Sequence, residues 1–250
     1  MYDFKITKRE VLFSLVIISL MTIIGLVIHG NINENIMLQH QEYNTAIQIE
    51  NDKDLFAYGM RTNIGKAFVY GELKAIDTVT YPEIGGSYSY IQKVKERYTK
   101  HTRTVTKTKT VNGKTKHYTE QETYWTWDKV DSWDKHCEKI SFLDVEFDYG
   151  KIEFPSPDHI ATIKESSKIR YKYYGTKDSY IGTIYTTLKD NTINQTSFFN
   201  NKGINETIED LESEWGLVVF WIFWILLTAG CVFGFYYLDN RWLENENKYY

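Results

Sequence analysis

The sequence predicts a membrane protein in which two transmembrane α-helices flank one β-rich (α+β) extracytoplasmic domain with a long protruding β-hairpin. Three observations support this fold class. Apolar residues are concentrated near both ends of a 250-residue chain that is only 42% hydrophobic. The polar middle carries runs of β-branched and aromatic residues, which favour strands. Within it, an Asn-Gly pair separates two long Thr-rich runs, as in a tight hairpin.

The first apolar segment, residues 11–29, has the length of a transmembrane helix. A hydrocarbon core of about 30 Å requires about 20 apolar residues in a helix, because backbone groups find no water there. The polar atoms of its apolar run are hydroxyls on Ser14, Ser19 and Thr22, which can bond to helix carbonyls. A cleaved signal peptide is the alternative, but its apolar region spans only about 7–15 residues. We therefore predict an uncleaved signal anchor.

The second apolar segment, residues 215–238, begins at Trp215 and is followed by further aromatic residues. Tryptophan and tyrosine favour the lipid headgroup level, where both an apolar ring and a polar tip are satisfied. A buried core helix is the alternative, and the polar character of the rest of the chain argues against it. Gly230 and Gly234 lie on one face of this helix, where they would allow close pairing with the first span, with another membrane protein, or with a second copy in a homo-oligomer formed through this second transmembrane helix.

The orientation follows from the positive charges beside the first span. Lys5, Lys8 and Arg9 precede it, whereas the next basic residue after it is Lys53, so the N-terminus is predicted to be cytoplasmic. The approach to the second span, residues 206–214, is acidic. In a plasma membrane, the predicted organisation is a cytoplasmic N-terminus (1–10), transmembrane helix 1 (11–29), an extracytoplasmic β-rich domain (30–214), transmembrane helix 2 (215–238) and a cytoplasmic tail (239–250).

Charge and cysteine content exclude several classes of function. The net charge of −4 argues against a nucleic-acid partner. Cys137 lies in the external domain and Cys231 within the second span, so the two cannot pair and there is no intrachain disulfide framework. No zinc-ligand spacing, serine elbow or phosphate loop occurs in the sequence, so we predict no cofactor and no metal.

The external domain reads as strands separated by glycine, proline and aspartate turns. A short helix capped by an acidic residue is predicted over Asp52–Met60, and further short helices near Pro157–Lys164 and just before Trp215. The stretch Asn31–Asn51 is polar and ambiguous. The predicted strands are KAFVYGEL (66–73), AIDTVTY (75–81), SYSYIQKV (87–94), ISFLDVEF (140–147), KIEF (151–154), IRYKYYG (169–175) and SYIGTIYTTL (179–188).

The turn at Asn112-Gly113 fixes the register of the long hairpin. A type I′ turn needs positive φ at both central residues, so Val111 is expected to pair with Lys114. That register places Arg103 opposite Glu122 and Arg97 opposite Asp128, two pairs of complementary charge. One face of the resulting arm is rich in threonine and the other is charged, while an aromatic cluster forms at the base. The threonines are Thr102, Thr104, Thr106, Thr108, Thr110, Thr115, Thr119 and Thr123, and the aromatic residues are Tyr98, Trp125 and Trp127.

The arm is the leading candidate for a binding surface. Residues 93–117 contain nine Lys or Arg and one Glu, so they would attract anions such as lipid headgroups, an anionic wall polymer or an acidic envelope protein. The alternative is that Lys and Thr only keep an exposed hairpin soluble and unpaired. The candidate binding residues are Arg97, Lys100, Arg103, Lys107, Lys109, Lys114 and Lys116.

A second cluster surrounds the external cysteine in YWTWDKVDSWDKHC (124–137), where Asp134, His136 and Cys137 are the residues of catalytic interest. Catalysis by a Cys/His pair requires an imidazole that activates the thiolate. Adjacent residues on one strand point to opposite faces, so His136 and Cys137 are not expected to pair. Structural packing of the aromatic residues is the favoured interpretation, and no catalytic residue is assigned.

Residues 65–154 resemble a known class of membrane-anchored domain. The segments GKAFVYGELKAID (65–77), SYSYIQKVKERY (87–98), YWTWDK (124–129) and ISFLDVEFDYGKIEF (140–154) are similar to the GIDE/BAM-type β domain, which lies between two spans in mitochondrial ubiquitin ligases. The resemblance implies a scaffold or regulatory domain at a membrane surface. No RING sequence follows the second span in this chain, so ligase activity is not carried over.

Three functions are compatible with these features. The leading hypothesis is a non-enzymatic, membrane-anchored binding or scaffold protein whose external β domain meets an envelope partner or an anionic surface through the arm. The second is an exclusion or immunity membrane protein of a phage or mobile element. The third is an envelope enzyme that uses the Asp/His/Cys cluster, although an enzyme is the less favoured class.

Overall fold

The computed structural model describes residues 7–111 and 114–246. It divides the chain into two compact units: a β unit, Ala46–Thr207, and a helical unit formed by the segments before and after it. Two long apolar helices thus flank a β-rich domain, as the sequence predicts. The β unit is narrower than the range 30–214, because the first helix continues to Thr45.

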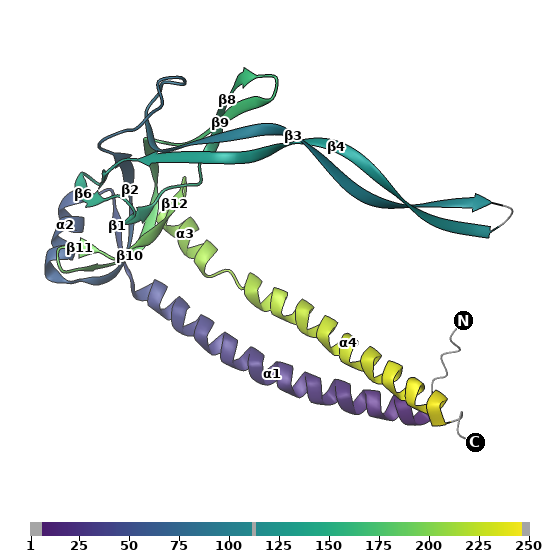
Figure 1. Cartoon of the computed structure of the whole chain (residues 1–250). Helices are drawn as coiled ribbons and strands as arrows, with labels where there is room; N and C mark the ends of the chain where they lie inside the picture. The colour runs from purple at the N-terminus through teal and green to yellow at the C-terminus, as the bar shows by residue number, and fades with distance from the viewer. Residues whose placement is uncertain (1–6, 112–113, 247–250) are drawn as a thin grey trace. The chain divides into compact units, whose positions relative to one another are not determined.

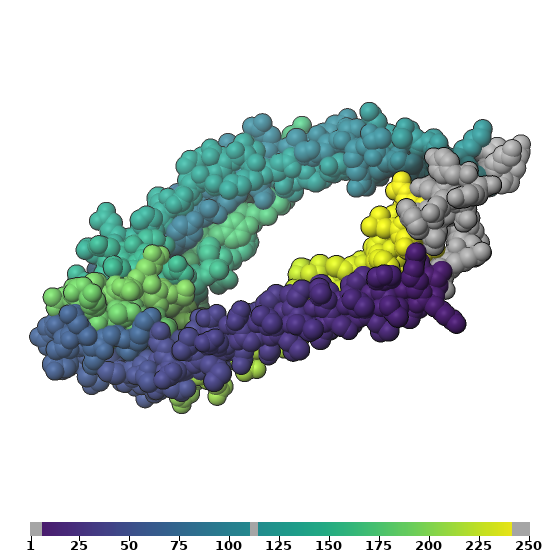
Figure 2. Space-filling model, turned by 90° about the horizontal axis from the view of Figure 1, so that it is seen from below, coloured from purple at the N-terminus to yellow at the C-terminus, as the bar shows by residue number. Residues whose placement is uncertain are grey.

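The helical unit is an antiparallel pair of helices, α1 (Lys8–Thr45) and α4 (Trp215–Glu246), both long and apolar enough to cross a bilayer. They contain the predicted spans 11–29 and 215–238. A further helix, α3 (Ile204–Leu211), precedes α4, in agreement with the helix expected before Trp215. Most of the large apolar side chains of the two spans are exposed on the surface of the pair, and Figure 2 shows this surface of α1 in purple.

Polar groups inside the first span are satisfied within the helix. The hydroxyls of Ser14, Ser19 and Thr22 donate to the carbonyls of residues three or four positions earlier, at 2.8 Å in each case. This confirms the role that the sequence assigned to them. No unpaired side-chain group of these residues therefore opposes burial of α1 in an apolar medium.

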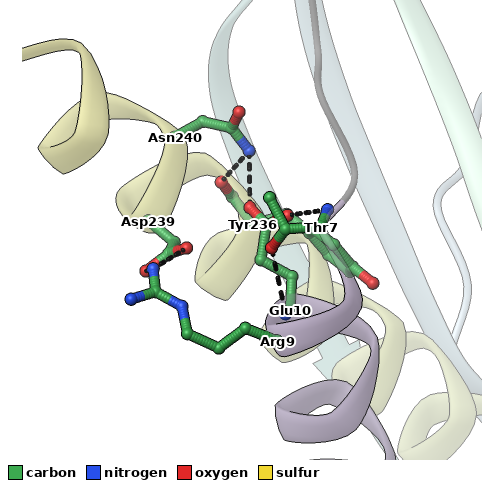
Figure 3. A network of polar contacts seen from close by, with 6 residues as sticks. All are labelled: Thr7, Arg9, Glu10, Tyr236, Asp239 and Asn240. Atoms are coloured by element: carbon green, nitrogen blue, oxygen red, sulfur yellow. Dashed lines mark hydrogen bonds and ion pairs between the residues drawn. The ribbon is translucent and has the colours of Figure 1, made fainter. Parts of the chain in front are cut away.

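α1 begins with a capping box, which the sequence pattern Thr7-Lys-Arg-Glu10 encodes and which our sequence analysis missed. The Thr7 N–H donates to Glu10 Oε2 at 2.6 Å, and the Glu10 N–H donates to Thr7 Oγ1 at 3.3 Å. Asn240 of α4 donates to Glu10 Oε1 at 2.9 Å, while Arg9 donates to both carboxylate oxygens of Asp239 at 2.8 and 2.7 Å (Figure 3). The same residues that start α1 thus hold it against the end of α4.

The β unit contains an eight-stranded sheet in the order β6-β5-β2-β10-β12-β7, with β1 beside β2 and β11 beside β10 (Figure 1). Its central pair, β2 and β10, is antiparallel, and β1 joins β2 in parallel. The strands are β1 (Ile47–Glu50), β2 (Gly65–Ala75), β5 (Lys139–Phe142), β6 (Val145–Asp148), β7 (Ile152–Glu153), β10 (Ser179–Lys189), β11 (Thr192–Ile193) and β12 (Thr196–Asn200).

The hydrophobic core packs between this sheet and helix α2 (Lys53–Thr62). The predicted acidic cap is confirmed, because the Asp52 side chain accepts the Leu55 N–H at 2.9 Å. Phe56 of α2 is fully buried and meets Phe142 and Phe147 edge to face. The apolar face of α2 and the inward residues of the sheet therefore form one core.

A second, four-stranded sheet has the order β4-β3-β9-β8. Its strands are β3 (Tyr88–Val111), β4 (Lys114–His136), β8 (Asp158–Ser166) and β9 (Ile169–Lys177). β9 pairs with β3 between Tyr88 and Arg97 and not beyond, so β3 and β4 continue as a two-stranded ribbon (Figures 1 and 2). This ribbon is the predicted hairpin, and we call it the arm.

Three local predictions were wrong. The segment 157–164 is strand β8 rather than a helix, because it pairs with β9. ISFLDVEF forms two strands, β5 and β6, joined at Leu143 and Asp144, which both have positive φ (49° and 56°). The segment 75–81 is not a strand beyond the end of β2 and makes only the isolated bridge between Val79 and Tyr88.

Candidate binding surface: the β3–β4 arm

The register of the arm is the one predicted from its turn. Val111 pairs with Lys114, Arg103 with Glu122 and Arg97 with Asp128. The turn residues Asn112 and Gly113 themselves lie outside the described residues. A register shift between Lys95 and Glu96, which the sequence did not reveal, places one extra residue in β4 near the root of the arm.

From Arg97 to the tip, successive side chains alternate between two faces. The charged face combines the odd-numbered residues of β3 with the even-numbered residues of β4. Of the predicted binding residues it carries Arg97, Arg103, Lys107, Lys109 and Lys116, whereas Lys100 lies on the opposite face. The side chain of Lys114 is outside the described part of the structure.

The charged face is partly neutralised by β4, which lowers its basic character. Arg103 contacts Glu122 at 2.7 Å, and Lys107 contacts Glu120 at 2.8 Å. Nearer the root, His101 meets Asp128 at 2.6 Å. Hydrogen bonds from Thr126 and His101 lower the pKa of the Asp128 carboxyl, so this group is an anion at neutral pH.

Lys109 and Lys116 are different, because they face each other directly across the strands near the tip. Directly opposed side chains in an antiparallel pair have Cβ atoms about 4.5–5.5 Å apart, so like charges there repel. No carboxylate of the described residues lies within ion-pair distance of either lysine. Two positive charges without an ion-pair partner among the described residues therefore meet at this pair.

The opposite face, which we call the hydroxyl face, combines the even-numbered residues of β3 with the odd-numbered residues of β4. Its only Lys or Arg between residues 98 and 127 is Lys100, and it has no Asp or Glu. The predicted threonine row lies on this face. Thr108 and His117 meet across the strands at 3.3 Å.

The aromatic base lies at the root end of the hydroxyl face. Tyr98 stacks on Trp125 with a centroid distance of 5.3 Å and lies 5.2 Å from the Trp127 ring, which confirms the predicted cluster. Arg170 of β9 lies over the Trp127 ring at 4.2 Å. This cation–π contact was not predictable from the sequence, because Arg170 lies 43 positions after Trp127 in the chain.

Arg170 also anchors the root through Glu96. The Glu96 carboxylate pairs with Arg170 and, at 3.1 Å, with Lys172, and its side chain is only 12% exposed. Burial opposes ionisation of Glu96, but the hydrogen bonds from Arg170 and Lys172 outweigh it and lower its pKa. These ion pairs connect β3 to β9 where the ribbon leaves the sheet, so they fix the base from which the arm projects.

The Asp/His/Cys cluster lacks the geometry of a nucleophilic site. Cys137 is fully buried in the core, and burial raises the pKa of its thiol to about 11. The His136 ring bonds to the Cys137 backbone carbonyl through Nδ1 at 2.8 Å and stacks on Tyr149. Among residues 7–111 and 114–246, no group of three His, Cys, Asp or Glu side chains is placed to hold a metal ion. A buried, protonated thiol next to a histidine engaged elsewhere is a structural feature.

The pairing of the two long helices does not use the predicted glycines. Gly230 and Gly234 have no neighbouring atom within 4 Å of an added Cβ, whereas an added Cβ at Gly25 would lie 2.5 Å from Nε1 of Trp224. That indole donates to the Met21 carbonyl at 3.0 Å. Gly25 therefore provides the space for Trp224 in the helix pair, and Gly230 and Gly234 lie on a face that α1 leaves open.

Comparison of the chain with protein-family models, with curated proteins and with solved structures gives no match.

Proposed function

We propose that the chain is an integral membrane protein that crosses the bilayer with α1 and α4. The supporting observation is the apolar surface of the helix pair, on which side chains such as Leu12, Leu26 and Leu226 are 55–67% exposed. Water would oppose exposure of so large a contiguous apolar area, whereas lipid tails would cover it. The ion pair between Arg9 and Asp239 joins the start of α1 to the end of α4, which is the antiparallel arrangement that two successive crossings of a membrane require.

We propose further that both termini are cytoplasmic, that the β unit lies outside, and that the membrane is the plasma membrane. The basic residues beside the start of α1 support this orientation. Protease added to intact cells should cut the β unit and spare an epitope tag at either terminus. Cleavage of the tags with protection of the β unit would refute the topology.

The function that the geometry supports best is non-enzymatic binding: a membrane-anchored scaffold that presents its arm to an anionic envelope partner. The observation that carries this proposal is the opposed pair Lys109 and Lys116. A protein that needed only a soluble hairpin would gain stability from opposite charges at these positions, as it does at Arg103 and Glu122. An anion bound between two lysines would instead remove their repulsion.

The experiment compares two double variants of the full-length chain in nanodiscs of zwitterionic lipid. Lys109→Gln/Lys116→Gln should weaken binding of poly-L-glutamate, and the loss should shrink as salt rises. Lys164→Gln/Lys168→Gln removes the same charge from exposed positions around β8 and should leave binding unchanged. Equal affinities of the two variants would refute the assignment of the arm as the contact.

A further inference from the structure

The two faces of the arm offer different chemistry to one ligand. The charged face presents the lysine pair near the tip, while the hydroxyl face presents aromatic rings at the base and hydroxyl groups beyond them. Hydroxyl and amide groups on this face, including those of Thr104, Thr106 and Gln121, both donate and accept hydrogen bonds. A partner that carries only charge would use the lysines and leave the aromatic–hydroxyl surface without a role.

The shape of the arm suits a long, thin ligand. From Arg97 to Thr110 the arm is two strands wide, and 14 residues at about 3.3 Å each make it about 45 Å long. The two strands cross over each other along its length in Figure 1, as the right-handed twist of a two-stranded ribbon requires. A linear polymer lying along one side of such a ribbon meets the hydroxyl face in one part and the charged face in another.

The aromatic base has the properties of a stacking platform. Trp125 is 45% exposed although it stacks on Tyr98, so part of the indole faces solvent. A sugar ring has an apolar face of C–H groups and a rim of hydroxyls, and it gains from covering an exposed aromatic ring. The neighbouring threonines are placed to bond to the rim.

We propose that the anionic partner of the arm is a linear anionic glycan, a polymer of sugar rings that carries regularly spaced anionic groups. This inference rests on the proposed function and identifies the chemical class of its ligand. The sugar rings lie on the aromatic base and along the threonines, while the anionic groups meet Lys109 and Lys116. The binding is non-covalent, so no bond is made or broken.

A lipid surface fits the arm less well. A hairpin that enters a bilayer needs apolar residues at the end that enters, because charged groups resist transfer to hydrocarbon. The residues nearest the tip that the structure describes with side chains are Lys109, Thr110, Thr115 and Lys116, all polar. The two tryptophans of the arm, which would favour a headgroup region, lie instead at the opposite end, where Arg170 lies over Trp127.

The test uses four probes with the full-length chain in zwitterionic nanodiscs: dextran sulfate, uncharged dextran, poly-L-glutamate and vesicles containing anionic phosphatidylglycerol. Dextran sulfate should bind more tightly than poly-L-glutamate at equal charge concentration, because only the former adds sugar stacking. Trp125→Ala should weaken dextran sulfate binding roughly three- to tenfold and leave poly-L-glutamate binding unchanged.

Trp133→Ala is the matched control, because Trp133 is 43% exposed and belongs to the root of β4 rather than to the aromatic base. Thr104→Val/Thr106→Val removes hydroxyls while keeping the side-chain shape, and it should also weaken only dextran sulfate binding. This second variant tests the inference even where Trp125→Ala disturbs the arm.

The outcomes separate the two proposals. If neither polyanion binds, the proposed function and this inference both fail. If poly-L-glutamate binds as tightly as dextran sulfate and all three variants behave alike, the arm is a general anion site and the glycan inference is overturned. Binding to anionic vesicles without binding to dextran sulfate would overturn it in favour of a lipid surface.

Discussion

Replacing the two carboxylates that neutralise the charged face should strengthen the binding of a polyanion. From the pair Arg97 and Asp128 to the pair Lys109 and Lys116, the charged face carries five Lys or Arg against Glu120, Glu122 and Asp128, a net charge of +2. The variant Glu120→Gln/Glu122→Gln raises this to +4. Both carboxylates are about half exposed in their ion pairs, so their loss should cost the fold little.

The gain in affinity follows from Coulomb's law. A long polyanion held at Lys109 and Lys116 reaches further along the charged face, and an anion that it placed beside Lys107, on the side away from Glu120, would lie about 5.5 Å from that carboxylate, twice an ordinary ion-pair contact. At the dielectric constant of water, each such repulsion is worth about 0.75 kcal/mol. Removing two of them gives about 1.5 kcal/mol, or roughly tenfold in affinity at low salt. Screening with a Debye length of about 8 Å halves this energy at physiological salt and leaves a gain of about three- to fourfold.

The assay is equilibrium binding of dextran sulfate to the full-length chain in zwitterionic nanodiscs at two salt concentrations. The control, Asp144→Asn/Asp190→Asn, removes two exposed carboxylates from turns of the other sheet and should change affinity by less than twofold. If Glu120→Gln/Glu122→Gln binds no more tightly than the unchanged protein at low salt, the charged face does not contact the anion.

Three further predictions concern stability. Gly182→Ala should lower the melting temperature of the β unit by about 5–10 °C in a thermal melt, because an added Cβ would lie 2.2 Å from a backbone carbonyl oxygen of β12. The control Gly203→Ala, which has open space around the added Cβ, should change the melting temperature by less than about 2 °C. The pKa of Glu96 is lowered in the folded state, so its ionised form stabilises the fold above the ordinary glutamate pKa of about 4.3, and this stabilisation is lost as the pH falls through the folded-state pKa. Glu96→Gln should therefore be less stable than the unchanged protein at pH 7 and should lose less stability in acid. Denaturant midpoints measured across pH will show both effects. Gly25→Leu should destabilise the helix pair in nanodiscs by displacing Trp224, whereas Gly230→Leu should leave the pair intact and, if oligomers form, dissociate them in a cross-linking assay.

The sequence predicted the features that short-range rules determine. The Asn-Gly turn was sufficient to set the pairing of Arg103 with Glu122 nine residues beyond it, because a ladder without bulges keeps its register. The cap at Asp52 and the long apolar helices likewise depend on local pattern. The resemblance to the GIDE/BAM-type domain is of a different kind and stays a prediction.

What the sequence missed depends on contacts between distant residues. The segment after Pro157 has a helix-like start, yet its pairing with β9 makes it a strand, since tertiary pairing overrides weak local preference. The ambiguous stretch Asn31–Asn51 is helix as far as Thr45, because it continues α1, and then forms strand β1. In the candidate site, neutralisation of the arm by Glu120 and Glu122 was available from the predicted register, whereas the Arg170 contact with Trp127 required the fold.

The length of α1 has a mechanical consequence for a protein anchored as we propose. The helix has 38 residues and no proline, so it is one continuous helix about 57 Å long. Its last 15 residues, Asn31–Thr45, extend about 22 Å past the span. A force that tilts this outer segment must also tilt the part of the helix inside the bilayer, and it would strain the ion pair between Arg9 and Asp239 at the other end of the helix. Such a lever would carry tension from outside the cell to the cytoplasmic surface without any change in secondary structure.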